Sequence, residues 1–308
     1  VVGFALDEAL PLRPTLTDRT DAIVNGLLGD RLGRHRRRLE LNMGLRDKTG
    51  ALIHPATLRS ALPAATSRIV VIVHGFADNE RRWWSSDDQP VLADKLATDP
   101  ALTTLTIRYN NGRQISSNGR HLADLMEDIQ MNWPVPIDSI GLVGHSLGGL
   151  VLRSACVTAQ QQDHRWVEKV AEVISIGSPH RGTPLEKLVS AATSTLNVAQ
   201  STKPLAEFLN TRSSGIKDLR SGSNLAVLPA HIRQRFVAGV VTSEPDHPAG
   251  MVLGDLVVRT ESATDGRSLD PADLLVIGGV HHNDLLRDKR ATDRIAEWLT
   301  EHTAAAAG

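Results

Sequence analysis

The chain has 308 residues, a formal net charge of −1 and 41% apolar residues, which are ordinary values for a globular protein. This length can bury a large core in one large domain or two small ones. Neither sign of charge dominates, so we expect no nucleic-acid partner, and the basic run at residues 34–38 is interpreted as a solvated face, with an anionic partner as the alternative. The longest apolar runs, of about five to seven residues, fall far short of the roughly 18 to 20 needed to span a bilayer, so no integral membrane segment is expected.

Cys156 is the single cysteine, which excludes an internal disulfide. We expect it to pack as a small apolar residue rather than to act as a nucleophile. No charged start followed by an apolar core and a cleavage site is present, so a cytoplasmic location is the default. Because the chain lacks an initiating Met, an upstream signal peptide could have been removed. The sequence does not indicate an oligomeric state.

The first segments predict a helix and then a hairpin. Apolar positions between Leu16 and Leu28 share one helical face, so residues 1–36 are expected to be a helical extension packed on the main domain. Alternating apolar residues from 39 to 45, a turn at 47–50, and a second short apolar pair then predict a β-hairpin.

The following segments alternate between strand and helix patterns. Strands are predicted at residues 69–73, 102–107, 139–145, 171–176, 236–241 and 274–277. Helices are predicted at residues 91–97, around 122–129, at 147–158 and at 292–301. This alternation predicts an α/β fold with a mostly parallel, doubly wound sheet of about eight strands.

One stretch interrupts this alternation, because the strands at 171–176 and 236–241 are too far apart for a simple crossover. We interpret residues 183–235 as a helical lid or cap over the site, with structural helices that have no gating role as the alternative. The main domain is expected to span residues 37–302, and residues 303–308 are expected to be a disordered tail.

The motif Gly144-x-Ser146-x-Gly148 lies at the junction of a predicted strand and a predicted helix. This is the nucleophile-elbow spacing, in which the serine occupies a strained turn and the glycines make room for it. The helix N-terminus also presents free N–H groups and a partial positive charge beside the serine. We therefore predict that Ser146 is a nucleophile, and a chance match is the alternative.

A serine nucleophile needs donors for the oxyanion that it generates. His74-Gly75-Phe76 ends the strand at 69–73, and we expect the backbone N–H of Phe76 and that of Leu147 to form the oxyanion hole. Further candidates for substrate binding, for which packing or positioning is the alternative, are His74, Gly75, Trp83, Trp84 and His145.

The serine also needs a base, and the base needs an acid that orients it. The last predicted strand leads into His281 and His282, of which one can serve as the base. Asp255, at a turn that follows a glycine, is favoured as the acid over Asp246, which lies in a loop flanked by prolines. The remaining acids after the strand at 236–241 are interpreted as turn or cap residues, namely Asp265, Asp270 and Asp273.

Together these motifs resemble the α/β-hydrolase superfamily, and within it the bacterial lipase-like and esterase-like serine hydrolases. The motifs GHSLGG, HGF, SPHRGTP (residues 178–184), GDLVV and HHNDLL are similar to those of that family and occur in its order, over about residues 37–299. The resemblance implies that the register His-x-Asp-Leu-Leu selects His282 as the base, with His281 as the alternative. It implies a triad of Ser146, Asp255 and His282. Many relatives have a glycine after the aspartate, where this chain has Leu256.

The resemblance implies cleavage of carboxylic esters through an acyl-enzyme intermediate, on a small-molecule or lipid ester. It implies neither a metal nor a cofactor. Because this fold hosts many chemistries, an acyltransferase, a thioesterase or an amidase with the same triad are alternatives. An alternative from another class is a binding protein that has kept the fold without turnover.

Overall fold

The computed structural model describes residues 42–85, 91–183, 227–266 and 269–305. The N-terminal extension expected at residues 1–36 and most of the lid or cap expected at 183–235 lie outside the described residues.

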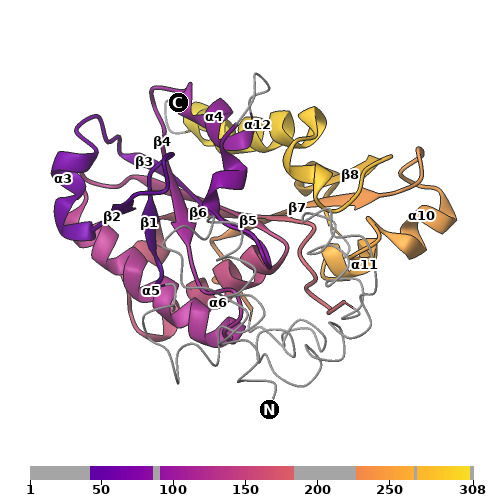
Figure 1. Cartoon of the computed structure of the whole chain (residues 1–308), viewed down its shortest axis with the longest axis horizontal. Helices are drawn as coiled ribbons and strands as arrows, with labels where there is room; N and C mark the ends of the chain where they lie inside the picture. The colour runs from indigo at the N-terminus through magenta and orange to yellow at the C-terminus, as the bar shows by residue number, and fades with distance from the viewer. Residues whose placement is uncertain (1–41, 86–90, 184–226, 267–268, 306–308) are drawn as a thin grey trace, which may run out of the picture.

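A sheet of eight strands forms the centre of the molecule (Figure 1). The strands are β1 (Gly44–Arg46), β2 (Leu52–Ile53), β3 (Arg68–Val73), β4 (Thr103–Arg108), β5 (Ser139–His145), β6 (Val170–Ile176), β7 (Arg233–Val240) and β8 (Leu274–Gly278). Their spatial order is β2-β1-β4-β3-β5-β6-β7-β8. β1 runs antiparallel to β2 and β4, and the strands from β3 to β8 are parallel to one another. The expected α/β fold with a mostly parallel sheet is confirmed.

Helices cover both faces of the sheet (Figure 1). α5 (Ile115–Asn132) and α6 (Leu147–Gln161) pack on one face, and α4 (Leu92–Ala97) and α12 (Lys289–Ala305) pack on the other. The short helices of the connections are α3 (Leu58–Ala61), α10 (Pro248–Leu253) and α11 (Thr260–Ala263). The 3-10 turns are η2 (Pro55–Thr57), η3 (Glu80–Trp83), η4 (Trp166–Lys169), η5 (Pro271–Asp273) and η6 (Asp284–Leu286).

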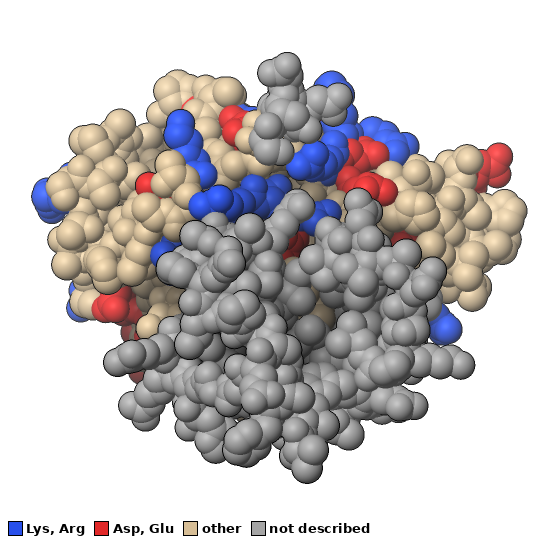
Figure 2. Space-filling view, in the orientation of Figure 1, with Lys and Arg blue, Asp and Glu red and all other residues tan. Residues whose placement is uncertain are grey.

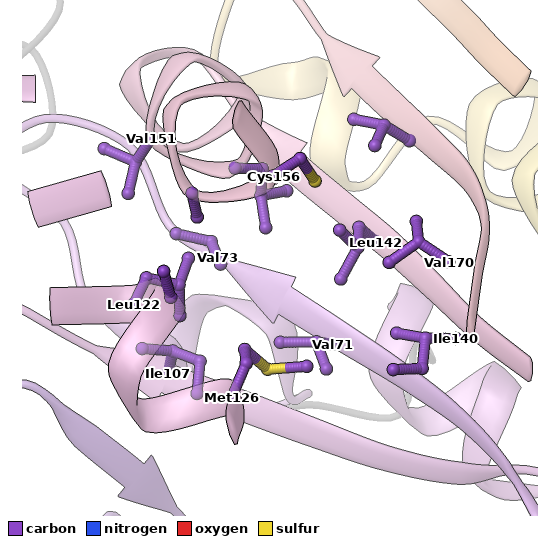
Figure 3. Close-up of a cluster of buried hydrophobic side chains, with 14 of the residues drawn as sticks. Val71, Val73, Ile107, Leu122, Met126, Ile140, Leu142, Val151, Cys156 and Val170 are labelled. Atoms are coloured by element: carbon purple, nitrogen blue, oxygen red, sulfur yellow. The ribbon is translucent and has the colours of Figure 1, made fainter. Parts of the chain in front are cut away.

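Branched apolar side chains of the central strands form the core beneath α5 and α6. Figure 3 shows Val71 and Val73 of β3 close to Leu122 and Met126 of α5. A strand covered on both faces has to be apolar on both faces, which explains the uninterrupted run of branched residues in β3. Cys156 of α6 lies in the same cluster and is fully buried. Burial raises the pKa of its thiol to about 12, so the thiol stays protonated and packs as an apolar group, as expected.

Two boundaries of the expected domain division differ from the structure. β7 begins at Arg233, so the last three residues of the insertion expected at 183–235 belong to the sheet. Arg233 and Arg235 make the start of this strand look polar in the sequence. They can lie in the sheet because Asp273 and Glu172, which come from other elements, neutralise their charges. α12 extends to Ala305, so the first residues of the tail expected at 303–308 are helical, in line with the high helix propensity of alanine.

Charged side chains of both signs share the outer surface. On the face shown in Figure 2, Lys and Arg side chains lie next to Asp and Glu side chains in the upper part of the molecule, where Figure 1 shows α4 and α12. Asp293 of α12 pairs with Lys95 of α4 and with Lys289 of its own helix. None of the helices in the described part of the chain combines the length and the apolar character needed to cross a membrane.

A buried charge cluster joins β6, β7 and α12. Arg235 and Glu172 are almost fully buried, and Arg235 Nε lies 3.1 Å from Glu172 Oε2. Glu301 accepts from Arg235 Nη2 at 2.6 Å, and Asp273 accepts from Arg233 Nε at 2.6 Å, so three carboxylates share two guanidinium groups. Burial raises the pKa of Glu172 from its ordinary 4.5 to about 7, because it outweighs the opposing effect of Arg235.

Backbone strain gathers at the edge of the sheet where the parallel strands end. Among the described residues other than glycine, five have a positive φ, and three of these lie in loops after β3, β5 and β7, namely Ala77, Ser146 and Leu256. This conformation costs a residue other than glycine roughly 1–2 kcal/mol. Such residues cluster at functional sites, so this edge of the sheet is a candidate for one. Leu256, with φ of 73°, takes a backbone conformation that favours glycine.

The first prediction concerns the buried Glu172. Folding raises the pKa of Glu172, so the protonated carboxyl group stabilises the folded protein. This stabilisation is complete below pH 4.5 and is lost as the pH rises through about 7. The free energy of unfolding should fall by about 3 kcal/mol across this range. Glu172→Gln, which stays neutral, should flatten the fall in urea unfolding measured at pH 5 and pH 8. Glu297→Gln, on the exposed side of α12, is the control and should follow the wild type. Equal pH dependence of Glu172→Gln and the wild type would contradict the prediction.

The second prediction concerns Leu256, whose side chain is 45% exposed and therefore contributes little packing. Leu256→Gly should raise the free energy of unfolding by about 0.5–1 kcal/mol, because the relief of strain exceeds the added chain entropy of glycine. Leu253→Gly is the matched control, since Leu253 is 43% exposed but lies in α10. That change should lower the free energy of unfolding by about 1 kcal/mol. Equal losses at both positions would show that Leu256 is not strained.

Candidate active site

Four loops meet at the carboxyl edge of the parallel strands. The residues that they carry are His74-Gly75-Phe76 after β3, Ser146 after β5, Asp255 between β7 and β8, and His282 after β8. β3 and β5 are neighbours, and β6, β7 and β8 follow in order. Because parallel strands end at the same edge, residues far apart in sequence are brought to one rim of the sheet.

Ser146 occupies the sharp turn between β5 and α6, with φ of 52° and ψ of −120°. Its backbone N–H donates to the carbonyl of Ile176 at 2.8 Å, which fixes the turn to the end of β6. At Gly148 a Cβ would collide with the carbonyl oxygen of Val73, so glycine is needed for the close approach of α6 to β3. Strand, strained turn and helix form the arrangement that the spacing predicts for a nucleophile elbow.

Asp255 and His282 are joined by a hydrogen bond of 2.7 Å between Asp255 Oδ2 and His282 Nδ1. The other carboxylate oxygen, Oδ1, accepts the N–H groups of Val257 at 3.0 Å and Val258 at 2.8 Å. The backbone N–H of His282 donates to the carbonyl of Asp255 at 3.2 Å. Both side chains are almost fully buried, with 1% of Asp255 and 4% of His282 exposed. A carboxylate only accepts, so Nδ1 of the imidazole carries a hydrogen and donates it to Asp255.

Close contacts bring the other loops beside the elbow. A Cβ built on Gly75 would lie 3.1 Å from Ser146 Cβ, so the turn after β3 touches the serine. A Cβ on Gly177 would lie 3.2 Å from His282 Cε1, and Gly177 directly follows Ile176, which accepts the N–H of Ser146. The turn after β3 and His282 therefore both lie close to the elbow.

The two expected oxyanion donors come from two segments, the turn after β3 and the start of α6. Phe76 packs partly buried against the core, and Leu147 is fully buried as the first residue of α6. Neither backbone N–H has an acceptor among the described residues. The partial positive charge at the N-terminus of the long helix α6 adds to their attraction for an anion.

His74 holds the turn after β3 through hydrogen bonds and ring stacking. Its ring stacks on Tyr109, with 4.4 Å between the centroids. Its Nε2 accepts the N–H of Tyr109, and its Nδ1 therefore donates to the carbonyl of Gly75 at 2.9 Å. The hydroxyl of Tyr109 donates to the carbonyl of His74 at 2.9 Å. Burial lowers the pKa of His74, which keeps the ring neutral.

Tyr109 and the ion pair of Arg108 with Glu80 were not expected from the sequence. Arg108 Nε donates to Glu80 Oε2 at 2.6 Å, and both side chains are buried between β4 and η3. The pair fixes η3, the segment that follows the turn after β3. One feature of the sequence could have indicated them. Arg108 and Tyr109, the single tyrosine of the chain, stand at the end of a strand, on the edge of the sheet where the candidate site lies.

The loop at residues 178–183 is attached to the loop that carries Asp255. The hydroxyl of Ser262 donates to the carbonyl of Gly182 at 2.8 Å and accepts the N–H of Arg181 at 3.1 Å. The hydroxyl of Thr183 donates to the carbonyl of Val257, two residues after Asp255. The SPHRGTP motif thus supports the position of Asp255.

The tryptophans named as candidates lie in the core. Trp83 is 1% exposed and belongs to the apolar cluster beneath α4 and α12, and Trp84 packs against the same cluster. This placement favours packing, the alternative that the sequence left open, over contact with a substrate.

The other candidates for base and acid lie elsewhere. His281 is exposed, as is Asp246. Asp265 pairs with Arg153 at 2.7 Å, and Asp270 accepts the N–H of Ala272 as the cap of η5. No group of three or more His, Cys, Asp and Glu side chains within the described part of the chain is arranged to hold a metal ion.

Comparisons with known proteins agree with this architecture. Residues 105–262, about half of the chain, match the family described as PGAP1-like alpha/beta domain. A triacylglycerol lipase from Burkholderia plantarii is 28% identical over 156 residues, which are 51% of this chain and 42% of the lipase. The alignment thus spans less than half the length of this relative.

Solved structures show the same fold. The mature form of the Bacillus licheniformis lipase BlEst2 is 20% identical with a TM-score of 0.54, over 84% of this chain and 98% of the lipase. Its propeptide form is also 20% identical, with a TM-score of 0.55 over 84% of this chain and 53% of that chain. The chain belongs to the PGAP1-like alpha/beta domain family, a lipase- and esterase-like branch of the α/β-hydrolase superfamily.

Proposed function

We propose that this protein is a serine hydrolase that cleaves carboxylic esters. The observation that carries the proposal is the 2.7 Å hydrogen bond between Asp255 and His282 at the rim that also holds the elbow serine. A hydroxyl is a weak nucleophile until a base removes its proton. The bond to Asp255 supplies such a base, because it directs the unprotonated Nε2 of His282 away from the carboxylate.

In the first half of the proposed reaction, Ser146 is acylated. Its Oγ forms a bond to the ester carbonyl carbon while its proton passes to Nε2 of His282. The negative charge moves to the carbonyl oxygen, where the N–H groups of Phe76 and Leu147 stabilise it. His282 then gives the proton to the leaving alcohol oxygen as the ester bond breaks. The alcohol leaves and the acyl group stays on Ser146.

In the second half, water releases the acyl group. His282 takes a proton from the water, whose oxygen bonds to the acyl carbon. The bond to Ser146 Oγ breaks, and the proton returns to that oxygen. A carboxylic acid leaves and the site is restored.

The surface beside the acid favours an apolar acyl group, and with it a lipid ester. The large apolar side chains exposed there are Met251, Val252, Leu253 and Leu256. They come from α10 and the turn that follows it, so they flank Asp255 in sequence. The Burkholderia plantarii relative, a triacylglycerol lipase, acts on such esters by its name.

The third prediction tests the nucleophile. Ser146→Ala should lower kcat/KM on chromogenic esters on the order of 10⁴-fold or more, because no other group can carry the acyl intermediate. Rates would be measured over a range of acyl lengths, together with labelling by a fluorophosphonate probe. The wild type should be labelled, the variant should not, and an optimum at long acyl chains would support the lipid substrate.

Ser154→Ala is the control for this experiment, because Ser154 is buried on the same helix away from the turn. It should keep the activity and the labelling of the wild type. Full activity of Ser146→Ala would overturn the proposal, and an ester product formed only when an alcohol is added would indicate acyl transfer instead.

The fourth prediction tests the acid. In Asp255→Asn the amide oxygen can still accept the N–H groups of Val257 and Val258, but the amide nitrogen then faces His282 as a donor. This favours the wrong tautomer of the imidazole, and kcat should fall by about 10⁴-fold while the protein stays folded. Asp270→Asn is matched, because Asp270 also accepts an N–H two residues ahead, and it should leave kcat unchanged. Similar kcat values for both variants would exclude Asp255 as the acid.

A further inference from the structure

His145, the residue before the elbow serine, has no part in the proposed reaction although it lies against the site. It is 2% exposed, and its ring is tilted against that of His282 with 4.7 Å between the centroids. Its Nε2 lies 3.2 Å from the backbone carbonyl oxygen of His282. A side chain of the elbow therefore contacts the backbone of the residue proposed as the base.

The direction of this hydrogen bond follows from the chemistry of its partners. A carbonyl only accepts, so Nε2 of His145 carries a hydrogen and donates it. Nδ1 is then the unprotonated nitrogen, and it has no partner among the described residues. Burial, followed by the nearby His282 and Arg82, holds the pKa of His145 well below 6.5, in keeping with a neutral ring.

A second donor binds the next carbonyl of the same loop. Arg82 Nη2 donates to the carbonyl of Asn283 at 3.2 Å, and Arg82 Nε lies 3.3 Å from Asp78. Arg82 belongs to η3, which follows the turn after β3. The backbone N–H of His282 in turn donates to Asp255. The loop that carries His282 is thus bound by His145 of the elbow, by Arg82 of η3 and by the backbone of Asp255.

We propose that His145 is a positioning residue, whose Nε2–H holds the carbonyl of His282 so that the imidazole stays aligned between Asp255 and Ser146. This inference rests on the proposed function. The bond to Asp255 fixes the Nδ1 side of the ring, but the ring also turns with the backbone that carries it. A displacement of about 1 Å at a reacting group can lower the rate about 100-fold. The bond from His145 opposes such a displacement.

The alternative is that His145 only fills space in the elbow. Glutamine and methionine separate the two, because their side chains are similar in length and volume and only glutamine has an N–H donor. A space-filling role predicts that His145→Gln and His145→Met behave alike. A positioning role predicts that His145→Gln recovers activity that His145→Met lacks.

The fifth prediction follows from this pair. His145→Met should lower kcat about 10- to 100-fold with little change in KM, since alignment and not binding is lost. His145→Gln should recover most of that loss. The control is His231→Phe, which removes a similar bond from His Nε2 to the carbonyl of Val167, 3.1 Å long and away from the site. It should leave kcat unchanged. Steady-state kinetics, the rate of fluorophosphonate labelling and the Tm would be measured for each variant.

The outcomes separate this inference from the proposed function. A wild type that neither hydrolyses esters nor reacts with the fluorophosphonate would refute the proposed function. An active wild type with equal kcat values for His145→Gln and His145→Met would refute the positioning role alone. If the Tm shows that His145→Met does not fold, His145→Phe keeps the ring volume without the donor and replaces it in the comparison with His145→Gln.

Discussion

The hydrogen bond between His282 and Asp255 joins two loops that leave neighbouring strands and lie 27 residues apart in the sequence. One carboxylate oxygen is held by the N–H groups of Val257 and Val258, so the other is directed at the imidazole. The turn that allows this places Leu256 at a positive φ. The alignment of the acid is therefore set by the backbone, and its cost is paid in local strain rather than in lost packing.

Three buried histidines surround the elbow, and their partners give them different properties. His74 and His145 are bonded to backbone carbonyls, and burial keeps both rings neutral. His282 alone of the three has a carboxylate partner in the described part of the chain. In the proposed reaction this partner would stabilise the imidazolium that forms when His282 takes a proton. In the proposed reaction, a histidine of this site thus serves as a structural residue or as a base according to the group that it contacts.

Much of this arrangement can be predicted from the sequence where one pattern dominates a segment. The central strands are rich in branched residues, and the elbow spacing predicts the strained turn at Ser146 without coordinates. The start of β7 cannot be predicted in the same way, because Arg235 makes this segment look polar. Its charge is neutralised by Glu172 of β6 and Glu301 of α12, which are distant in the sequence. Tyr109 and the contact of His145 with His282 could not be predicted, because they depend on how loops from different strands meet.

Cys156 lies in the core cluster on α6, about three turns after Ser146, and it is the only thiol of the chain. With no exposed surface, it can react with an alkylating reagent only when this helix separates from the strands beneath it. Its rate of alkylation therefore reports how often the layer that carries the serine opens. Alkylation of this single thiol would therefore measure the local opening of α6 without an introduced label.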